Sequence, residues 1–122
     1  MTKAQALHQF FSGFDIPAYP TSNVPDDAIF PFLTYELVTG AWGGAPVALT
    51  VNLWYYTTSE KTPNAKAHEI SEAIGFGKVL KWEDGFIWLR RGTPWCQNLR
   101  DEADPIIKRR YLNITAEYLT LN

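Results

Sequence analysis

Residues that could carry nucleophilic or metal chemistry are few in this chain of 122 residues. There are two histidines, His8 and His68, and one cysteine, Cys96. No HxxxH or HExxH spacing connects the histidines, so we expect both on the solvent-facing sides of helices rather than in a metal site. A nucleophilic cysteine requires a nearby histidine and an orienting Asn or Asp. Nothing local places His68 beside Cys96, and we expect Cys96 to be an inert, at least partly buried thiol.

Charged clusters are the next candidates for chemistry. The acidic groups, Asp26-Asp27 and Asp101–Asp104, lie in loops flanked by proline, where Asp commonly bonds the backbone to close a turn. The basic groups are Arg90-Arg91, Arg100 and Lys108–Arg110, each with acidic neighbours. In a chain of net charge -2 they fit ion pairs between subunits at least as well as contacts with phosphates. No phosphate-binding loop, dinucleotide fingerprint or GxSxG elbow is present, so the sequence predicts no catalytic residue, cofactor or metal.

Length and composition indicate one domain spanning residues 1–122, with a core that needs no metal or disulfide. The five Trp, six Tyr and seven Phe can fill a small core and still supply anchors for contact surfaces. One cysteine allows no internal disulfide, which fits a reducing compartment. Neither a signal peptide nor an apolar run of about 20 residues is found, so we expect a protein made in a cytoplasm, with no membrane partner.

The elements that would position these residues follow from hydrophobic periodicity and from glycine and proline signals. Thr2 is expected to cap the first helix and Thr62 the second, while Glu83-Asp84-Gly85 predicts a hairpin turn. Extended segments and loops are expected at residues 17–25, 39–46 and 92–105. The predicted order is a helix ending near Gly13, strands over 32–38 and 47–58, a helix over 63–74, hairpin strands over 78–82 and 86–91, and a last strand over 108–120.

This order predicts an α+β fold. Long strands that are mostly antiparallel, combined with two helices, favour a two-layer sandwich with both helices packed on one face of the sheet. Val47, Leu49, Val51, Leu53 and Tyr55 are expected to point into the core, while Trp54 and Tyr56 lie on the opposite face.

One passage is more specific than these patterns. Val24–Tyr35, with the sequence VPDDAIFPFLTY, follows the predicted first helix and leads into the first strand. It resembles the tail terminator (tail completion) family of long-tailed bacteriophages and prophages. Residues 49–55, 64–75 and 110–118 are similar, in the same order, to that family's long second strand, following helix and closing strand.

The resemblance implies a structural virion protein and not an enzyme. Members of this family form a ring, typically a hexamer, at the head-proximal end of the tail tube. The ring stops tube polymerisation and provides the surface that joins the tail to the head. The implied partners are further copies of the chain, the tail tube protein and a head completion or neck protein. Assembly would take place in the host cytoplasm, and DNA would pass through the lumen without specific binding.

A closed ring uses a head-to-tail interface, so each subunit needs two different matching patches. Candidates for one patch are the aromatic residues Trp42, Trp54 and Tyr56. Candidates for a complementary charged patch are Arg90, Arg91, Arg100 and Asp101. The alternative for the tryptophans is that they cover the second face of the sheet under a helix.

Two other functions remain open. The chain could be another neck, head-completion (stopper) or tail tube protein of a phage. It could also be a small-ligand binding module or enzyme, with a pocket formed by Trp54, Tyr56, Trp88 and Trp95 together with His68 or Cys96. That function requires a deep pocket with converging polar groups.

Overall fold

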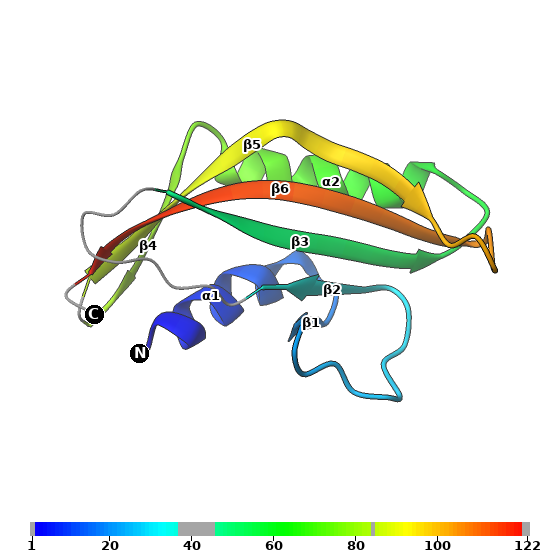
Figure 1. Cartoon of the computed structure of the whole chain (residues 1–122), viewed down its shortest axis with the longest axis horizontal. Helices are drawn as coiled ribbons and strands as arrows, with labels where there is room; N and C mark the ends of the chain where they lie inside the picture. Colours follow the sequence, from blue (N-terminus) through cyan, green and yellow to red (C-terminus); the bar gives the residue numbers. More distant parts are fainter. Residues whose placement is uncertain (1, 37–45, 84, 121–122) are drawn as a thin grey trace.

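The computed structural model describes residues 2–36, 46–83 and 85–120 (Figure 1). Its elements in chain order are α1 (Lys3–Phe11), the short 3-10 helix η1 (Ser12–Phe14), β1 (Ala18–Pro20), β2 (Phe32–Tyr35), β3 (Val47–Tyr56), α2 (Lys61–Ile74), β4 (Lys78–Trp82), β5 (Gly85–Arg100) and β6 (Ile107–Thr120).

The strands form one six-stranded sheet in the order β1-β2-β3-β6-β5-β4. β1 and β2 are parallel, and every other neighbouring pair is antiparallel. The long strands β3, β5 and β6 curve together along the length of the molecule (Figure 1). The predicted α+β class and the mostly antiparallel sheet are therefore confirmed.

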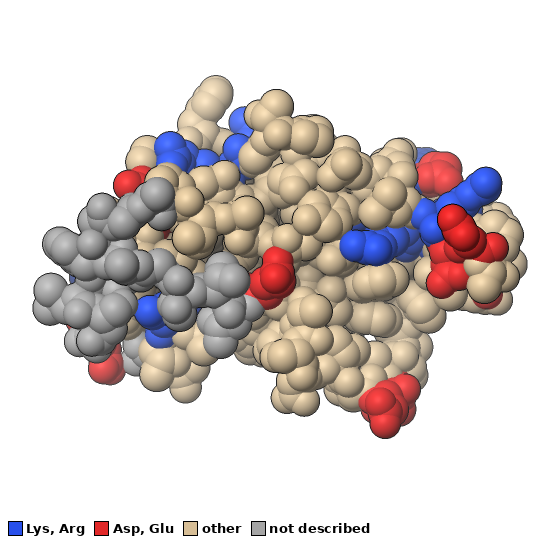
Figure 2. Space-filling view, in the orientation of Figure 1, with Lys and Arg blue, Asp and Glu red and all other residues tan. Residues whose placement is uncertain are grey.

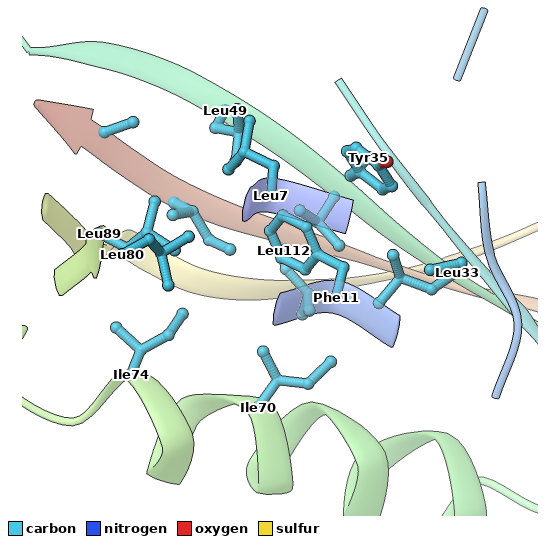
Figure 3. Packing of buried hydrophobic residues seen from close by; sticks show 14 of the residues in the cluster. Leu7, Phe11, Leu33, Tyr35, Leu49, Ile70, Ile74, Leu80, Leu89 and Leu112 are labelled. Carbon is cyan, nitrogen blue, oxygen red and sulfur yellow. The ribbon is translucent and has the colours of Figure 1, made fainter. Parts of the chain in front are cut away.

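The core lies between the helices and one face of the sheet. Leu7 and Phe11 of α1 and Ile70 and Ile74 of α2 are all buried in the same hydrophobic cluster (Figure 3). The strands contribute alternate residues to it, because successive side chains of a strand point to opposite faces. These residues include Leu49, Val51, Leu53, Ile87, Leu89, Leu112, Ile114 and Ala116.

The helix starts show which capping signals were informative. Thr2 caps α1 as predicted: its hydroxyl accepts a hydrogen bond from the Gln5 backbone N–H, and the Gln5 side chain accepts one from the Thr2 backbone N–H. The prediction that Thr62 caps the second helix is wrong, because α2 already begins at Lys61. Ser59 Oγ accepts a hydrogen bond from the Lys61 backbone N–H at 3.1 Å, which satisfies an amide at the helix start.

An ion pair between buried Arg110 and exposed Glu60 connects the same end of α2 to the sheet. Arg110 of β6 is only 1% exposed and donates from Nε to Asn64 Oδ1 at 3.0 Å. Its Nη2 donates to the carboxylate of Glu60, the residue that precedes α2. This hydrogen bond from Arg110 holds the pKa of Glu60 below its ordinary value of 4.5, and the charges of Arg110 and Lys108 lower it further.

Two strand predictions need correction. The loop expected over residues 92–105 is wrong for residues 92–100, because β5 continues to Arg100 and pairs with β6 on both sides of an irregularity between Arg91 and Cys96; residues 101–105 form a loop as predicted. β1 was not predicted as a strand; it lies in the proline-rich passage and pairs with β2 through Ala18 and Leu33. The predicted loop over residues 39–46 falls almost wholly outside the described residues.

Candidate assembly surface

Trp54 lies between the core residues Leu53 and Tyr55 of β3, and none of the described residues that line the hollow around it belongs to α1 or α2. Figure 2 shows the molecule from the side opposite to α2. In this view charged side chains gather at the tip where β5 leads into β6, while the middle of the sheet is mostly uncharged. A contact surface also requires exposed apolar side chains, which several of these strands supply.

Antiparallel register places an aromatic and arginine row on this face. Phe32 of β2 pairs with Trp54 of β3, and Trp54 pairs in turn with Arg109 of β6. Phe32 and Trp54 are stacked with ring centroids 6.3 Å apart. Because the three residues come from adjacent strands, their positions are set by the backbone hydrogen bonds of the sheet.

Polar contacts hold this row in place. The indole N–H of Trp54 donates to Thr34 Oγ1 at 3.0 Å. The Arg109 guanidinium carbon lies 5.3 Å from the centroid of the Trp54 ring and 5.6 Å from that of Tyr111. Arg109 Nε also donates to Asn52 Oδ1 at 2.7 Å. The guanidinium is thus oriented between two aromatic rings before any partner binds.

These residues line a hollow that we name the aromatic groove. It has a volume of about 490 Å³ and is lined by Thr21, Val24, Phe30, Phe32, Thr34, Asn52, Trp54, Asp101, Ile107 and Arg109. Within the described part of the chain, Arg109 makes no ion pair at 4.0 Å or less. The groove therefore offers apolar walls and a cation available to an acidic partner.

Asp101 lies at the rim of the aromatic groove. Its Oδ1 accepts hydrogen bonds from the backbone N–H groups of Ala103 at 2.8 Å and Asp104 at 3.1 Å. Asp104 Oδ1 accepts one from the Ile106 backbone N–H. The predicted turn-capping role of this acidic run is confirmed for Asp101 and Asp104, and the same turn fixes the Asp101 carboxylate beside the groove.

The three aromatic residues predicted for the assembly surface, Trp42, Trp54 and Tyr56, lie in different environments. Trp54 is half-buried in the groove and does not lie under either helix, so the alternative of a helix-covered tryptophan is wrong for this residue. Tyr56 is 55% exposed and packs against Phe30 with ring centroids 5.8 Å apart. Trp42 lies outside the described residues.

The charged candidates do not form a single patch. Arg90 stacks over Trp88 at 4.4 Å and lies 3.7 Å from Glu117, whereas Arg91, its neighbour, donates from Nη1 to Ser71 Oγ of α2 at 2.9 Å. The two arginines therefore point to opposite faces of β5. Arg100 pairs with Lys108 in the β5–β6 register, six β6 residues away from the partner of Arg91, which is about 20 Å along the strand. Arg100 and Asp101 lie together at the tip.

The residues proposed for a ligand pocket do not line one common hollow: Tyr56 lines one beside Phe30, and Trp88 packs against Gly77. His68, Trp95 and Cys96 line a hollow of about 270 Å³ between α2 and β5, but Trp54 lies in the aromatic groove instead. Burial raises the pKa of the Cys96 thiol, which keeps it protonated and weakly nucleophilic. The structure thus brings Cys96 and His68 to one hollow, which the sequence did not predict.

Two prominent surface residues were missed by the sequence reasoning. Arg109 was seen only as one member of a basic cluster, because its contacts with Trp54 and Asn52 join residues more than fifty positions apart. Phe76 was not singled out, yet it is 99% exposed. A phenylalanine between two glycines, Gly75 and Gly77, is the sequence signal that could have drawn attention to it.

Within residues 2–36, 46–83 and 85–120, no group of three or more His, Cys, Asp or Glu side chains is arranged to hold a metal ion. No helix in the same ranges has both the length and the apolar character needed to span a bilayer. Comparison with protein-family models, curated proteins and solved structures yields no match to this chain.

Proposed function

We propose that this chain is a structural virion protein of the tail terminator type, which forms a homo-oligomeric ring at the head-proximal end of a phage tail tube. The ring stops tube polymerisation and provides the surface to which a head completion or neck protein binds. The proposal includes a two-layer sandwich, in which the sheet forms one layer and both helices the other. Such a protein acts by binding alone and needs no catalytic residue or cofactor.

The observation that carries the proposal is the aromatic groove, which none of the described residues of α1 or α2 lines. Aromatic and arginine side chains are the residue types most enriched at binding hot spots, and here they are oriented in advance by Thr34 and Asn52. Preorganised contacts reduce the entropy lost on association. The likeness of Val24–Tyr35 to the tail terminator family is the reason for proposing a ring on a tail tube. Part of that segment lines the groove, namely Val24, Phe30, Phe32 and Thr34.

The test is assembly on tail tubes. The purified protein is measured by light scattering alone, and its effect on growing tail tubes is measured by electron microscopy. A terminator forms a discrete ring-sized species or caps tubes at a fixed length. A protein that stays monomeric and leaves tube growth unchanged would contradict the proposal.

A tail tube subunit and a head-completion protein are the nearest alternatives, and the same experiment separates them. A tube subunit would polymerise into long stacks of variable length. A head-completion protein would bind to heads and leave tube length unchanged.

A small-ligand binding module is the alternative of another class, and the volume of the aromatic groove lies within the range of ligand pockets, roughly 300–1,000 Å³. That function would require a ligand that binds the monomer and is lost on Trp54→Ala while the oligomeric state is unchanged.

A further inference from the structure

Phe76 is the most exposed large apolar residue of the described chain. It is 99% exposed and lies in the turn between α2 and β4. Full exposure of a phenylalanine ring to water is unfavourable, because burying an apolar surface of that size lowers the free energy. No part of the chain that the structure describes covers it, so we consider a second copy of the chain as the molecule that buries it.

The turn is built so that Phe76 projects outward. Gly75 ends α2 with φ +56°, a conformation that favours glycine, and its N–H donates to the Ser71 carbonyl. Gly77 lies against the Trp88 ring so closely that a Cβ at that position would be 2.3 Å from Trp88 Nε1. The Gly77 N–H also donates to the Ile74 carbonyl at 3.0 Å. Phe76 is therefore presented by backbone fixed on both sides.

Two charged side chains accompany Phe76. The Arg91 guanidinium lies 6.0 Å from the centroid of its ring and is held by Ser71. Glu72 lies in the last turn of α2, four residues before Phe76; its carboxylate lies 3.2 Å from His68 Nε2, and its side chain is 72% exposed. We name Phe76, Glu72 and Arg91 together the Phe76 knob.

The aromatic groove carries the complementary features. Its walls include Phe32 and Trp54, its cation Arg109 makes no ion pair in the described chain, and Asp101 stands at its rim. The Phe76 knob thus presents an apolar ring, the anion Glu72 and the cation Arg91, and the groove presents an apolar hollow, the cation Arg109 and the anion Asp101. Opposite charges placed in this way select a partner and its orientation.

We propose that the Phe76 knob of one subunit inserts into the aromatic groove of the next, with Glu72 facing Arg109 and Arg91 facing Asp101. The inference rests on the proposed ring function and identifies the contact that closes the ring. Phe76 lies in the turn between α2 and β4, whereas the groove is lined by residues of β2, β3 and the start of β6, and the two sets share no residue. Because the two patches do not overlap, each subunit can bind two neighbours, as a head-to-tail ring requires.

The first experiment measures self-association of the full chain by light scattering across a wide range of concentrations. Phe76→Ala and Arg109→Glu are each expected to weaken the subunit contact by about thirtyfold or more, the scale of a hot spot. Matched controls are Phe86→Ala, a second exposed phenylalanine, and Lys61→Glu, which reverses the charge of an exposed side chain that belongs to neither patch. Both controls should assemble as the wild type does.

The charge pairing has its own test, which also excludes misfolding as the cause. Glu72→Lys should weaken assembly because it places a cation against Arg109. The same change should slightly raise the melting temperature of the subunit, because a cation in the last turn is favourable to the helix dipole. Combining Glu72→Lys with Arg109→Glu should restore a large part of the assembly lost in either variant. Failure of the double variant to recover any assembly would overturn the pairing.

Mixing two defective variants tests the head-to-tail geometry. Phe76→Ala keeps an intact groove, and Arg109→Glu keeps an intact knob, so an equal mixture has one working contact per pair. The mixture should stop at a heterodimer of twice the 13.9 kDa chain mass. A mixture that stays monomeric, or one that forms full rings, would overturn the inference.

The outcomes separate this inference from the proposed function. If wild-type protein forms rings or caps tubes and Phe76→Ala and Arg109→Glu do so equally well, the contact is wrong and the terminator function stands. If wild-type protein neither self-associates at any concentration nor affects tail tubes, both proposals fail.

Discussion

Replacing Gly92 by alanine tests the largest difference between the sequence prediction and the structure. If residues 92–105 formed the exposed loop that the sequence predicts, this change would be nearly neutral or slightly stabilising. In the structure Gly92 lies in β5 directly over β6. An added Cβ would be 2.9 Å from both the carbonyl oxygen and the Cβ of Asn113.

The magnitude follows from what must move. The nearest atoms include the backbone of β6, a strand paired on both sides, so the clash cannot be relieved by turning a flexible side chain. Overpacking of this kind costs about 1–3 kcal/mol. For a domain of this size, each kcal/mol lowers the melting temperature by roughly 3–5 °C. We therefore expect Gly92→Ala to melt well below the wild type.

The assay is urea unfolding followed by tryptophan fluorescence, with Gly13→Ala as the matched control. No heavy atom outside its immediate neighbours lies within 4 Å of a Cβ built at Gly13, so that substitution should be neutral or stabilise by about 0.5–1 kcal/mol. Opposite signs for the two variants are expected. Equal stability of Gly92→Ala and wild type would refute the strand assignment at this position.

Three further predictions concern stability. Burial raises the pKa of Tyr118 from 10.0 to about 12, so the contribution of its neutral form to the free energy of unfolding is complete below pH 10 and is lost as pH rises from 10 to 12. Urea titrations should show that the free energy of unfolding falls by about 1–2 kcal/mol over this range, after solvent screening is allowed for. Tyr118→Phe should reduce this dependence on pH. Arg110 lowers the pKa of Glu60, so the stabilisation of the fold by the Glu60 carboxylate is present above pH 4.5 and is lost as pH falls below it. Glu60→Gln should melt below wild type at pH 7. A difference in melting temperature that persists unchanged at pH 3 would contradict the ion pair with Arg110. Thr2→Ala should cost about 1 kcal/mol in urea unfolding, while Thr62→Ala, which removes no cap, should be neutral; the reverse order would restore the original capping prediction.

The sequence was sufficient where local patterns determine structure. Strict alternation over 47–56 identified β3 and the residues of its core face, because the side-chain period of a strand is two. Thr2 followed by Gln5 identified the start of α1, because a capping box needs only residues three apart. The apolar runs on either side of Glu83-Asp84-Gly85 identified the β4–β5 hairpin.

Long-range pairing decided the rest. Residues 92–100 have no alternating pattern and contain Pro94, yet they form strand because β6 supplies hydrogen-bond partners from the far side of the tip. The candidate site depends on the same kind of contact. Arg109 becomes a positioned cation only through Trp54 and Asn52, and Phe76 is held in an exposed turn by Gly75, whose φ is positive, and by the contact of Gly77 with Trp88. The sequence alone determined the side-chain types and their local spacing. The register of the sheet determined which side chains contact each other and which stay exposed.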